Sequence, residues 1–329
     1  MRLAQYRELL SEMVGLNTVS PLSGARLAKV AGWLHRRGFR TIGRNLFARG
    51  SSRMPLWIYS HIDTKPVGCR ADWHTHPLHL TVQGGRWHGL GISDAKFQLL
   101  NVLLSPWSER AYVLVDAAEE CGDSDVGRLL SARDVDTFVV VDGFLEQSRI
   151  YNGAMGQLDG TITLRTGGLP RHPARSSSSQ ILVQLEKLIR DVETSGLRFN
   201  VTGASAPMTE RSLTLEQLTL RFDLRFNSRQ HASARSFVKR WAAETRQSIP
   251  PLEGRPALSR GMNMSASAAP FSSNLGRIHR APRRVLVVPG ALADNNNHRP
   301  NEFIWPQQIL SHQRTINRLL GVLCNESPT

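Results

Sequence analysis

Five short motifs along the chain combine histidine with acidic side chains, the residue types that hold divalent cations. They are Ser60-His61-Ile62-Asp63, Ser93-Asp94-Ala95-Lys96, Glu119-Glu120, Val141-Asp142-Gly143 and Asn297-His298-Arg299-Pro300-Asn301-Glu302. Imidazole nitrogens and carboxylate oxygens suit zinc, and cobalt or manganese can occupy the same ligands. A carboxylate that is not a ligand can take a proton from a water molecule. The set is therefore the one expected of a hydrolase that uses two metal ions.

Each motif also has a simpler explanation when it is taken alone. Asp94 can cap the N-terminus of a helix, and Asp142 with Gly143 can form a turn. The Glu119-Glu120 pair can be a solvated acidic turn, and His298 lies in a polar loop. The metal hypothesis therefore depends on the five motifs as an ordered set and not on any one of them.

Four of the five motifs follow an apolar, strand-like run or a loop after one. Strands are expected over 56–59, 111–115, 137–141 and 284–288, a hairpin over 78–90, and helices over 1–16, 24–38, 94–105 and 306–324. Strands that alternate with helices predict an α/β fold with a mixed, mostly parallel sheet flanked by helices. In α/β proteins, binding and catalytic residues usually lie at the carboxyl ends of such strands.

The pattern changes between residues 155 and 250. Strands over 161–165 and 213–226 alternate polar and apolar residues, and amphipathic helices are expected over 180–193 and 231–246. This is an α+β module of its own, with a β-α-β-β-α-like order. We therefore expect 1–154 and 251–329 to form the two parts of a catalytic domain, and 155–250 to be an inserted lid or dimerisation domain.

The composition narrows the class of protein. The formal net charge of +14 implies an anionic partner, surface or substrate. The basic residues are scattered and no nucleic-acid-binding signature occurs, so no specific nucleic acid is expected as a partner. No run of about 18 apolar residues occurs, so no membrane span is expected. Three widely spaced cysteines do not form a disulfide framework, and a reducing cytoplasm is the default localisation.

Taken in order, the motifs resemble those of the co-catalytic zinc amidohydrolases and metallopeptidases of the acetylornithine deacetylase, succinyl-diaminopimelate desuccinylase and carboxypeptidase G type. The resemblance covers nearly the whole chain. It includes the His-x-Asp motif at His61, the Asp-x-Lys motif at Asp94, the Glu-Glu pair and a His-x-Pro-x-Glu context at His298. It implies a zinc-exopeptidase-like fold with an inserted lid, and a pair of Zn²⁺ ions, with Co²⁺ or Mn²⁺ also suitable.

The resemblance also implies a role for each matching residue. The metal ligands would be His61, Asp94, Glu120, Asp142 and His298. Asp94 would bridge the two ions, Asp63 would orient His61, and Glu119 would be the general base. In the inserted domain, Arg225 would bind a substrate carboxylate and His172 would help to polarise the scissile carbonyl.

The chain departs from the family pattern at two points. Asp142 precedes Gly143 where many relatives have Glu-Pro, and no convincing Gly-x-Ser-Asp segment occurs before His298.

The reaction that the resemblance implies is cleavage of an amide bond that releases an amino acid or diamino acid. The resemblance also implies a candidate substrate, because some relatives release an amino acid from an acidic amino-group carrier protein in amino-acid biosynthesis. Basic segments over 165–175 and 280–299 would attract such a protein. The alternatives are a free N-acyl amino acid or small peptide, or a non-catalytic binding relative. The helices of the inserted domain can pair into a homodimer or stay exposed.

Overall fold

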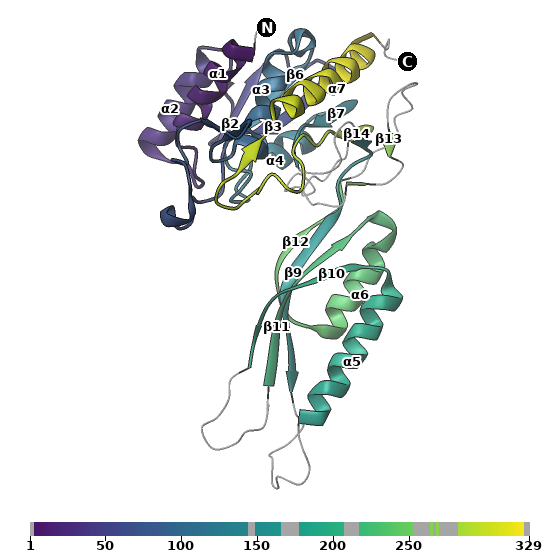
Figure 1. The fold of residues 1–329 in the computed structure, drawn as a ribbon. Coiled ribbons are helices and arrows are strands. Elements are labelled where there is room, and N and C mark those ends of the chain that lie inside the picture. The colour runs from purple at the N-terminus through teal and green to yellow at the C-terminus, as the bar shows by residue number, and fades with distance from the viewer. Residues whose placement is uncertain are drawn as a thin grey trace. The chain divides into compact units, whose positions relative to one another are not determined.

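The computed structural model describes residues 3–143, 149–165, 178–206, 217–252, 264–265, 268–269 and 282–325. The chain divides into two compact units (Figure 1). The first contains Met1–Gly153, Glu253–Ala269 and Arg277–Thr329, and the second contains Ala154–Leu252 and Pro270–Gly276. None of the described helices is long and apolar enough to cross a membrane. The second unit corresponds in position to the expected inserted domain, and its role as a lid or dimerisation domain stays a prediction.

The first unit is built on an eight-stranded sheet within the described residues. The strand order is β1 (Arg40–Thr41), β2 (Leu46–Arg49), β6 (Tyr112–Asp116), β3 (Leu56–His61), β7 (Thr137–Val140), β14 (Arg284–Val287), β8 (Ile150–Tyr151) and β13 (Met264–Ser265). The four strands β6, β3, β7 and β14 in its middle are parallel to one another. Their residues are buried on both faces, as in sheets that helices cover on two sides.

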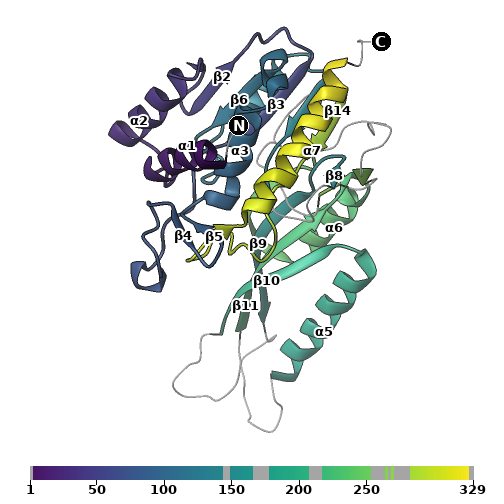
Figure 2. The same cartoon turned by 45° about the horizontal axis from the view of Figure 1, so that its top comes forward.

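Helices cover this sheet. They are α1 (Leu3–Gly15), α2 (Gly24–His35), α3 (Phe97–Leu103), α4 (Val126–Ser131) and α7 (Pro306–Asn325). In α7 the buried residues recur every three or four positions, which gives the helix one apolar face. Figure 2 shows α7 running alongside α3, and the two helices are in contact. A smaller sheet joins β4 (Thr81–Gln83), β5 (Arg86–His88) and β15 (Phe303–Ile304).

The second unit is an antiparallel sheet with two helices. Its strand order is β10 (Arg198–Ser205), β11 (Gln217–Phe226), β9 (Gly156–Arg165) and β12 (Ala242–Ile249), and its helices are α5 (Ser178–Ser195) and α6 (His231–Trp241). Alternate residues of β9 are buried, because one face of the strand packs on the core. That core is separate from the core of the first unit and contains Ile162, Leu188, Phe222 and Phe237.

The structure confirms the predicted mostly parallel α/β fold and corrects two details. The helix expected from residue 94 begins at Phe97, because Asp94 and Ala95 have non-helical backbone angles. The helix expected over 231–246 ends at Trp241, and Ala242–Ile249 forms a strand that pairs with β9. Sequence reasoning also missed β10, a strand that is exposed along most of its length.

Candidate active site

The parallel strands bring four of the candidate residues to one edge of the large sheet. His61 is the last residue of β3. The Glu119-Glu120 pair follows β6, and Asp142 follows β7, the two strands that flank β3. Because neighbouring parallel strands end at the same edge, residues far apart in sequence meet there.

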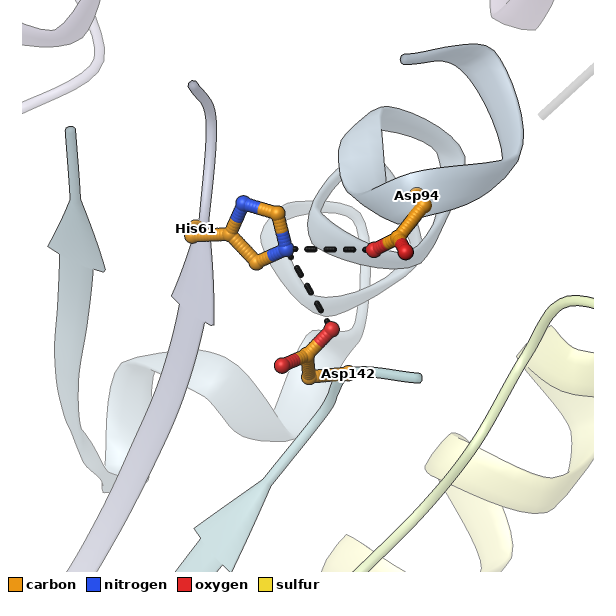
Figure 3. A group of neighbouring side chains, drawn as sticks. All are labelled: His61, Asp94 and Asp142. Carbon is orange, nitrogen blue, oxygen red and sulfur yellow. Dashed lines mark hydrogen bonds and ion pairs between the residues drawn. The ribbon is translucent and has the colours of Figure 1, made fainter. Parts of the chain in front are cut away.

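The first group of candidate ligands is His61, Asp94 and Asp142, and all three are buried. The His61 Nε2 lies 3.2 Å from Asp94 Oδ1 and 3.2 Å from Asp142 Oδ1 (Figure 3). The other ring nitrogen, Nδ1, lies 3.1 Å from the carbonyl oxygen of Asp63. A hydrogen bond donated from Nδ1 leaves the Nε2 lone pair directed at the two carboxylates, as in histidines that bind metal.

The second group is Asp94, Glu120 and His298. The His298 Nε2 lies 3.1 Å from Asp94 Oδ2 and 3.1 Å from Glu120 Oε1. Asp94 therefore directs one carboxylate oxygen at each histidine, which is the arrangement expected of a ligand that bridges two ions. The second carboxylate oxygen of Glu120 lies 2.8 Å from Lys65 Nζ, so Glu120 has one oxygen left for an ion.

The spacing of these atoms fits zinc. With metal–ligand distances of about 2.0–2.2 Å, two tetrahedral ligands of Zn²⁺ lie roughly 3.3–3.5 Å apart. The nitrogen–oxygen distances within both groups are 3.1–3.2 Å. Glu120 Oε1 is buried and makes no hydrogen bond of acceptable geometry within the described structure, although His298 is near it. A cation between the two residues would satisfy that oxygen.

Asp94 is held in place by Glu302, a residue far away in the sequence. The Glu302 carboxylate accepts hydrogen bonds from the backbone N–H groups of Gly91, Ser93 and Asp94, at 2.6, 2.8 and 3.1 Å. Gly91 has φ of +68°, and a Cβ there would lie 2.0 Å from Thr64 Cγ2. The turn that presents Asp94 therefore needs both a glycine and a buried carboxylate.

The His298 loop has its own supports. His298 has a positive φ of 60°, as do Asn296 and Asn301 at 57° and 64°, a conformation that asparagine and histidine adopt more readily than most residues. The side chain of Asn301 accepts a hydrogen bond from the His74 N–H at 2.7 Å and donates one to the Asp72 carbonyl at 2.8 Å. These two hydrogen bonds attach the His298 loop to residues 72–74, which precede the β4–β5 hairpin.

Asp63 connects His61 to the acidic pair. Its carboxylate accepts hydrogen bonds from the N–H groups of Glu119 and Glu120, at 3.2 and 2.9 Å, and from the Ser20 hydroxyl at 2.5 Å. The same carboxylate lies 3.5 Å from His61 Nδ1, farther than the Asp63 carbonyl oxygen. Asp63 is thus placed to orient His61 mainly through its backbone, while its side chain orients the Glu119-Glu120 turn.

The charges of the site shift the pKa values of its groups. Burial lowers the pKa of His298, but the adjacent carboxylates of Asp94 and Glu120 outweigh burial and raise this pKa to about 10. The pKa of His61 is also raised, because Asp142, Asp63 and Asp94 overcome the effect of burial. Each histidine therefore favours a positive charge at the position where a metal cation would lie.

The environment of Glu119 disfavours its negative charge. Burial raises its pKa well above the usual value, and the nearby Asp142 carboxylate raises it further, while His61 opposes this shift. A carboxylate with a raised pKa is a stronger base, and a base whose pKa approaches the working pH transfers protons efficiently. This environment suits the predicted general base.

Two predicted residues belong to the second unit. His172 lies outside the described residues, and its predicted role is not tested. Arg225 lies on β11, where its guanidinium makes a bidentate ion pair with Asp223 at 2.6 and 2.7 Å. Its binding of a substrate carboxylate stays a prediction.

Sequence reasoning missed three residues that shape the site: Ser20, Lys65 and Glu302. Glu302 is the last residue of the His298 motif, and Lys65 lies two residues after the His61 motif, so their positions were a signal. Ser20 lies more than 40 residues before Asp63, and nothing in the sequence connects the two.

Comparison with solved structures shows the same fold. The M20 family metallo-carboxypeptidase Sso-CP2 of Sulfolobus solfataricus is 14% identical and has a TM-score of 0.67, covering 97% of this chain and 99% of the other. The Bacillus subtilis YXEP protein, described as a dinuclear metal binding peptidase of the M20 family, is 12% identical, with a TM-score of 0.58 and coverage of 99% and 100%.

Curated relatives are similar over shorter stretches. The succinyl-diaminopimelate desuccinylase of Methylobacillus flagellatus is 31% identical over 100 residues, which are 28% of this chain and 26% of the relative. The enzyme of the same name from Dinoroseobacter shibae is 27% identical over 135 residues, 36% of each chain. The match thus spans only about a quarter to a third of these relatives. The model of peptidase family M20/M25/M40, however, matches residues 57–321. The chain therefore belongs to this peptidase family, as its ordered motifs predict.

Proposed function

We propose that the protein is a dinuclear, zinc-dependent amidohydrolase that releases an amino acid or diamino acid from an N-acyl substrate. The observation that carries the proposal is Asp94, whose two carboxylate oxygens face two separate histidines at 3.2 and 3.1 Å. A single ion needs no such bridging carboxylate. Membership of the M20 family supports a metal-dependent hydrolase, and the names of the curated relatives support an acylated amino acid as the substrate.

In the proposed reaction, some residues of the first unit bind the metal ions and another transfers protons. His61, Asp94 and Asp142 would hold one ion, and Asp94, Glu120 and His298 the other. Zn²⁺ ions supply Lewis acidity that activates water and polarises a carbonyl oxygen, and Co²⁺ or Mn²⁺ can substitute. Glu119 accepts the proton of the attacking water on its carboxylate, and then donates it to the nitrogen of the leaving amine.

The positioning of Glu119 supports this role. Its backbone N–H donates to Asp63, whose carbonyl oxygen also faces His61 Nδ1, so one residue contacts both the proposed base and a proposed ligand. The nearby Asp142 carboxylate raises the pKa of Glu119 beyond the effect of burial. These contacts support the proposal that Glu119 holds a proton between the two steps.

Hydrolysis of amides of several acyl groups by the zinc-loaded protein tests the proposal. N-acetyl, N-succinyl, N-glutamyl and carrier-linked amino acids cover the substrate classes that the family resemblance implies. We expect Glu119→Gln to lower kcat by about 10²–10⁴-fold, the usual contribution of a general base. The variant should keep the zinc content of the unchanged protein. Equal turnover by both proteins, or a protein that binds no metal, would favour a non-catalytic binding relative.

An acidic amino-group carrier protein is a second candidate for the substrate. The net charge of +14 favours it, since opposite charges accelerate the encounter of two proteins. The expected result is that kcat/KM for a carrier-linked amino acid falls steeply between 0.05 and 0.5 M salt, on the order of 10-fold or more. A free N-acyl amino acid provides the control, because its smaller charge should make it less sensitive to salt. Equal salt dependence of the two substrates would exclude steering of a carrier.

A further inference from the structure

A small cleft lies in the first unit beside the Asp94, Glu120 and His298 group. Its volume is about 50 Å³, several times the ~10–15 Å³ that one water molecule requires. Trp73 and Leu90, both buried, form part of its lining. The cleft can therefore accept a small polar group attached to a short aliphatic chain.

Two cationic side chains also line the cleft. The Lys65 ammonium is fixed by the Glu120 carbonyl oxygen at 2.6 Å and by Glu120 Oε2 at 2.8 Å, and its side chain stays 39% exposed. Arg299 is exposed, and its guanidinium makes no ion pair with any residue in the described part of the chain. Glu120, a candidate metal ligand, thus holds Lys65 at the cleft. The positive charge of Arg299 stays available to bind an anionic group of a substrate.

The carboxylates that line the cleft already contact other protein groups. Asp94 and Glu120 direct their oxygens at the two histidines and at Lys65. Glu302 directs its oxygens inward, where they accept hydrogen bonds from backbone N–H groups. With ions bound to Asp94 and Glu120, the uncompensated charge that faces the cleft is positive.

We propose that this cleft is a subsite for a carboxylate of the substrate, with Arg299 as the binding residue and Lys65 as a second, fixed positive charge. A guanidinium can bind a carboxylate with two parallel hydrogen bonds, and the apolar lining suits the methylene groups between that carboxylate and the scissile amide. The inference rests on the proposed function. It assigns two residues of the cleft, Arg299 and Lys65, to the recognition of a carboxylate close to the bond that is cleaved.

That carboxylate has two possible sources, the acyl group or the amino acid that is released. Two substrate pairs distinguish them. The first pair is an N-succinyl amino acid and its N-butyryl analogue, which lacks only the carboxylate of the acyl group. The second pair is an N-butyryl amino acid and its α-carboxamide, which lacks only the carboxylate of the amino acid. Arg299→Gln is compared with Arg318→Gln, which removes another exposed arginine, from α7 of the same unit.

We expect Arg299→Gln to raise KM and to lower kcat/KM by roughly 10-fold for the member of one pair that carries the tested carboxylate, because a charge-assisted hydrogen bond is lost. The member of that pair that lacks this carboxylate and kcat should change little, and Arg318→Gln should alter neither pair. The pair whose two members respond differently to Arg299→Gln identifies the source of the carboxylate. If Arg299→Gln affects both members of both pairs equally, the subsite is excluded.

A binding measurement separates failure of this inference from failure of the proposed function. Succinate is titrated calorimetrically into zinc-loaded Glu119→Gln protein, with and without Arg299→Gln. Weaker binding by roughly 10-fold in the double variant supports the subsite even if no amide is hydrolysed. Unchanged binding of succinate, together with turnover of uncharged amides, would overturn the subsite and leave the hydrolase intact.

Discussion

The two candidate ion positions share Asp94 but are built from different parts of the fold. The first position uses His61 and Asp142, which end or follow neighbouring strands of the sheet and are buried. The second uses Glu120 and His298, which lie in loops, and the His298 side chain is 40% exposed. Strand ends are fixed by the sheet itself, whereas loop ligands need dedicated contacts. We infer that the first position binds an ion more tightly and that the second exchanges its ion more readily.

The largest effect should come from Asp94, since both positions depend on it. Asp94→Ala should reduce bound zinc from two equivalents to less than one and lower kcat/KM by about 10³-fold or more, a loss of at least ~4 kcal/mol of transition-state stabilisation. Metal analysis after gel filtration, combined with a hydrolysis assay, measures both. Asp123→Ala is the control, because Asp123 forms an exposed ion pair with Arg44 and should affect neither. Retention of two zinc ions by Asp94→Ala would show that it is not a bridging ligand.

The next effect separates the two positions. His298→Ala should keep about one zinc equivalent, because His61, Asp94 and Asp142 remain. Stepwise addition of a chelator to the unchanged protein should remove zinc in two phases, with the first phase absent in His298→Ala. His61→Ala should weaken the tighter phase instead. A single phase in the unchanged protein, or loss of the buried ion first, would contradict the inferred difference between the positions.

A second buried histidine, His312, shows what the carboxylates contribute to the pKa of His61. His312 packs against Phe97 and accepts a hydrogen bond from Asn101, and burial lowers its pKa to about 4. Because the folded protein binds this proton more weakly than the unfolded chain, His312 favours folding fully above pH 6.5. That contribution is lost as the pH falls toward 4.

The lost stability should amount to about 3 kcal/mol for a pKa shift of this size. Urea unfolding of metal-free protein at pH 7.5 and pH 4.5 measures it. The pH dependence should be smaller in His312→Asn, while contributions from His61 and His298 cancel in the comparison. Parallel stability curves for the two proteins would show that His312 does not titrate in this way.

The smallest effect is expected from Glu302, which supports the Asp94 turn without touching an ion. Glu302→Gln replaces one acceptor oxygen by an NH₂ group, which leaves a backbone N–H without its acceptor. The free energy of unfolding should fall by about 2 kcal/mol, and zinc affinity by roughly 10-fold. Denaturant unfolding and a competitive zinc titration measure the two changes. Glu8→Gln, on the exposed side of α1, is the matched control.

Part of the candidate site could be predicted because three of its ligands, His61, Glu120 and Asp142, end or follow buried strands. The runs before His61 and Asp142 are apolar and short, so both the strand and its polar end are visible in the sequence. The order of the motifs predicted the family, which the family model confirms. The predicted roles of His172 and Arg225, the homodimer and the cytoplasmic localisation stay predictions.

The remaining features depend on contacts between distant residues. Asp94 resembles a helix cap in the sequence, but its backbone N–H is bound by Glu302, 208 residues away, and the helix begins later. Residues 242–246 continue a helical pattern, yet they pair with β9. Local propensity cannot reveal either contact, because tertiary structure overrides it.

The most direct test of two ions bridged by Asp94 is a crystal structure of zinc-loaded protein with diffraction data collected at the zinc absorption edge. The account predicts two anomalous peaks, one among His61, Asp94 and Asp142 and one among Asp94, Glu120 and His298. Each peak should lie about 2.0–2.2 Å from its ligand atoms. One peak alone, or two peaks that Asp94 does not bridge, would contradict the dinuclear site.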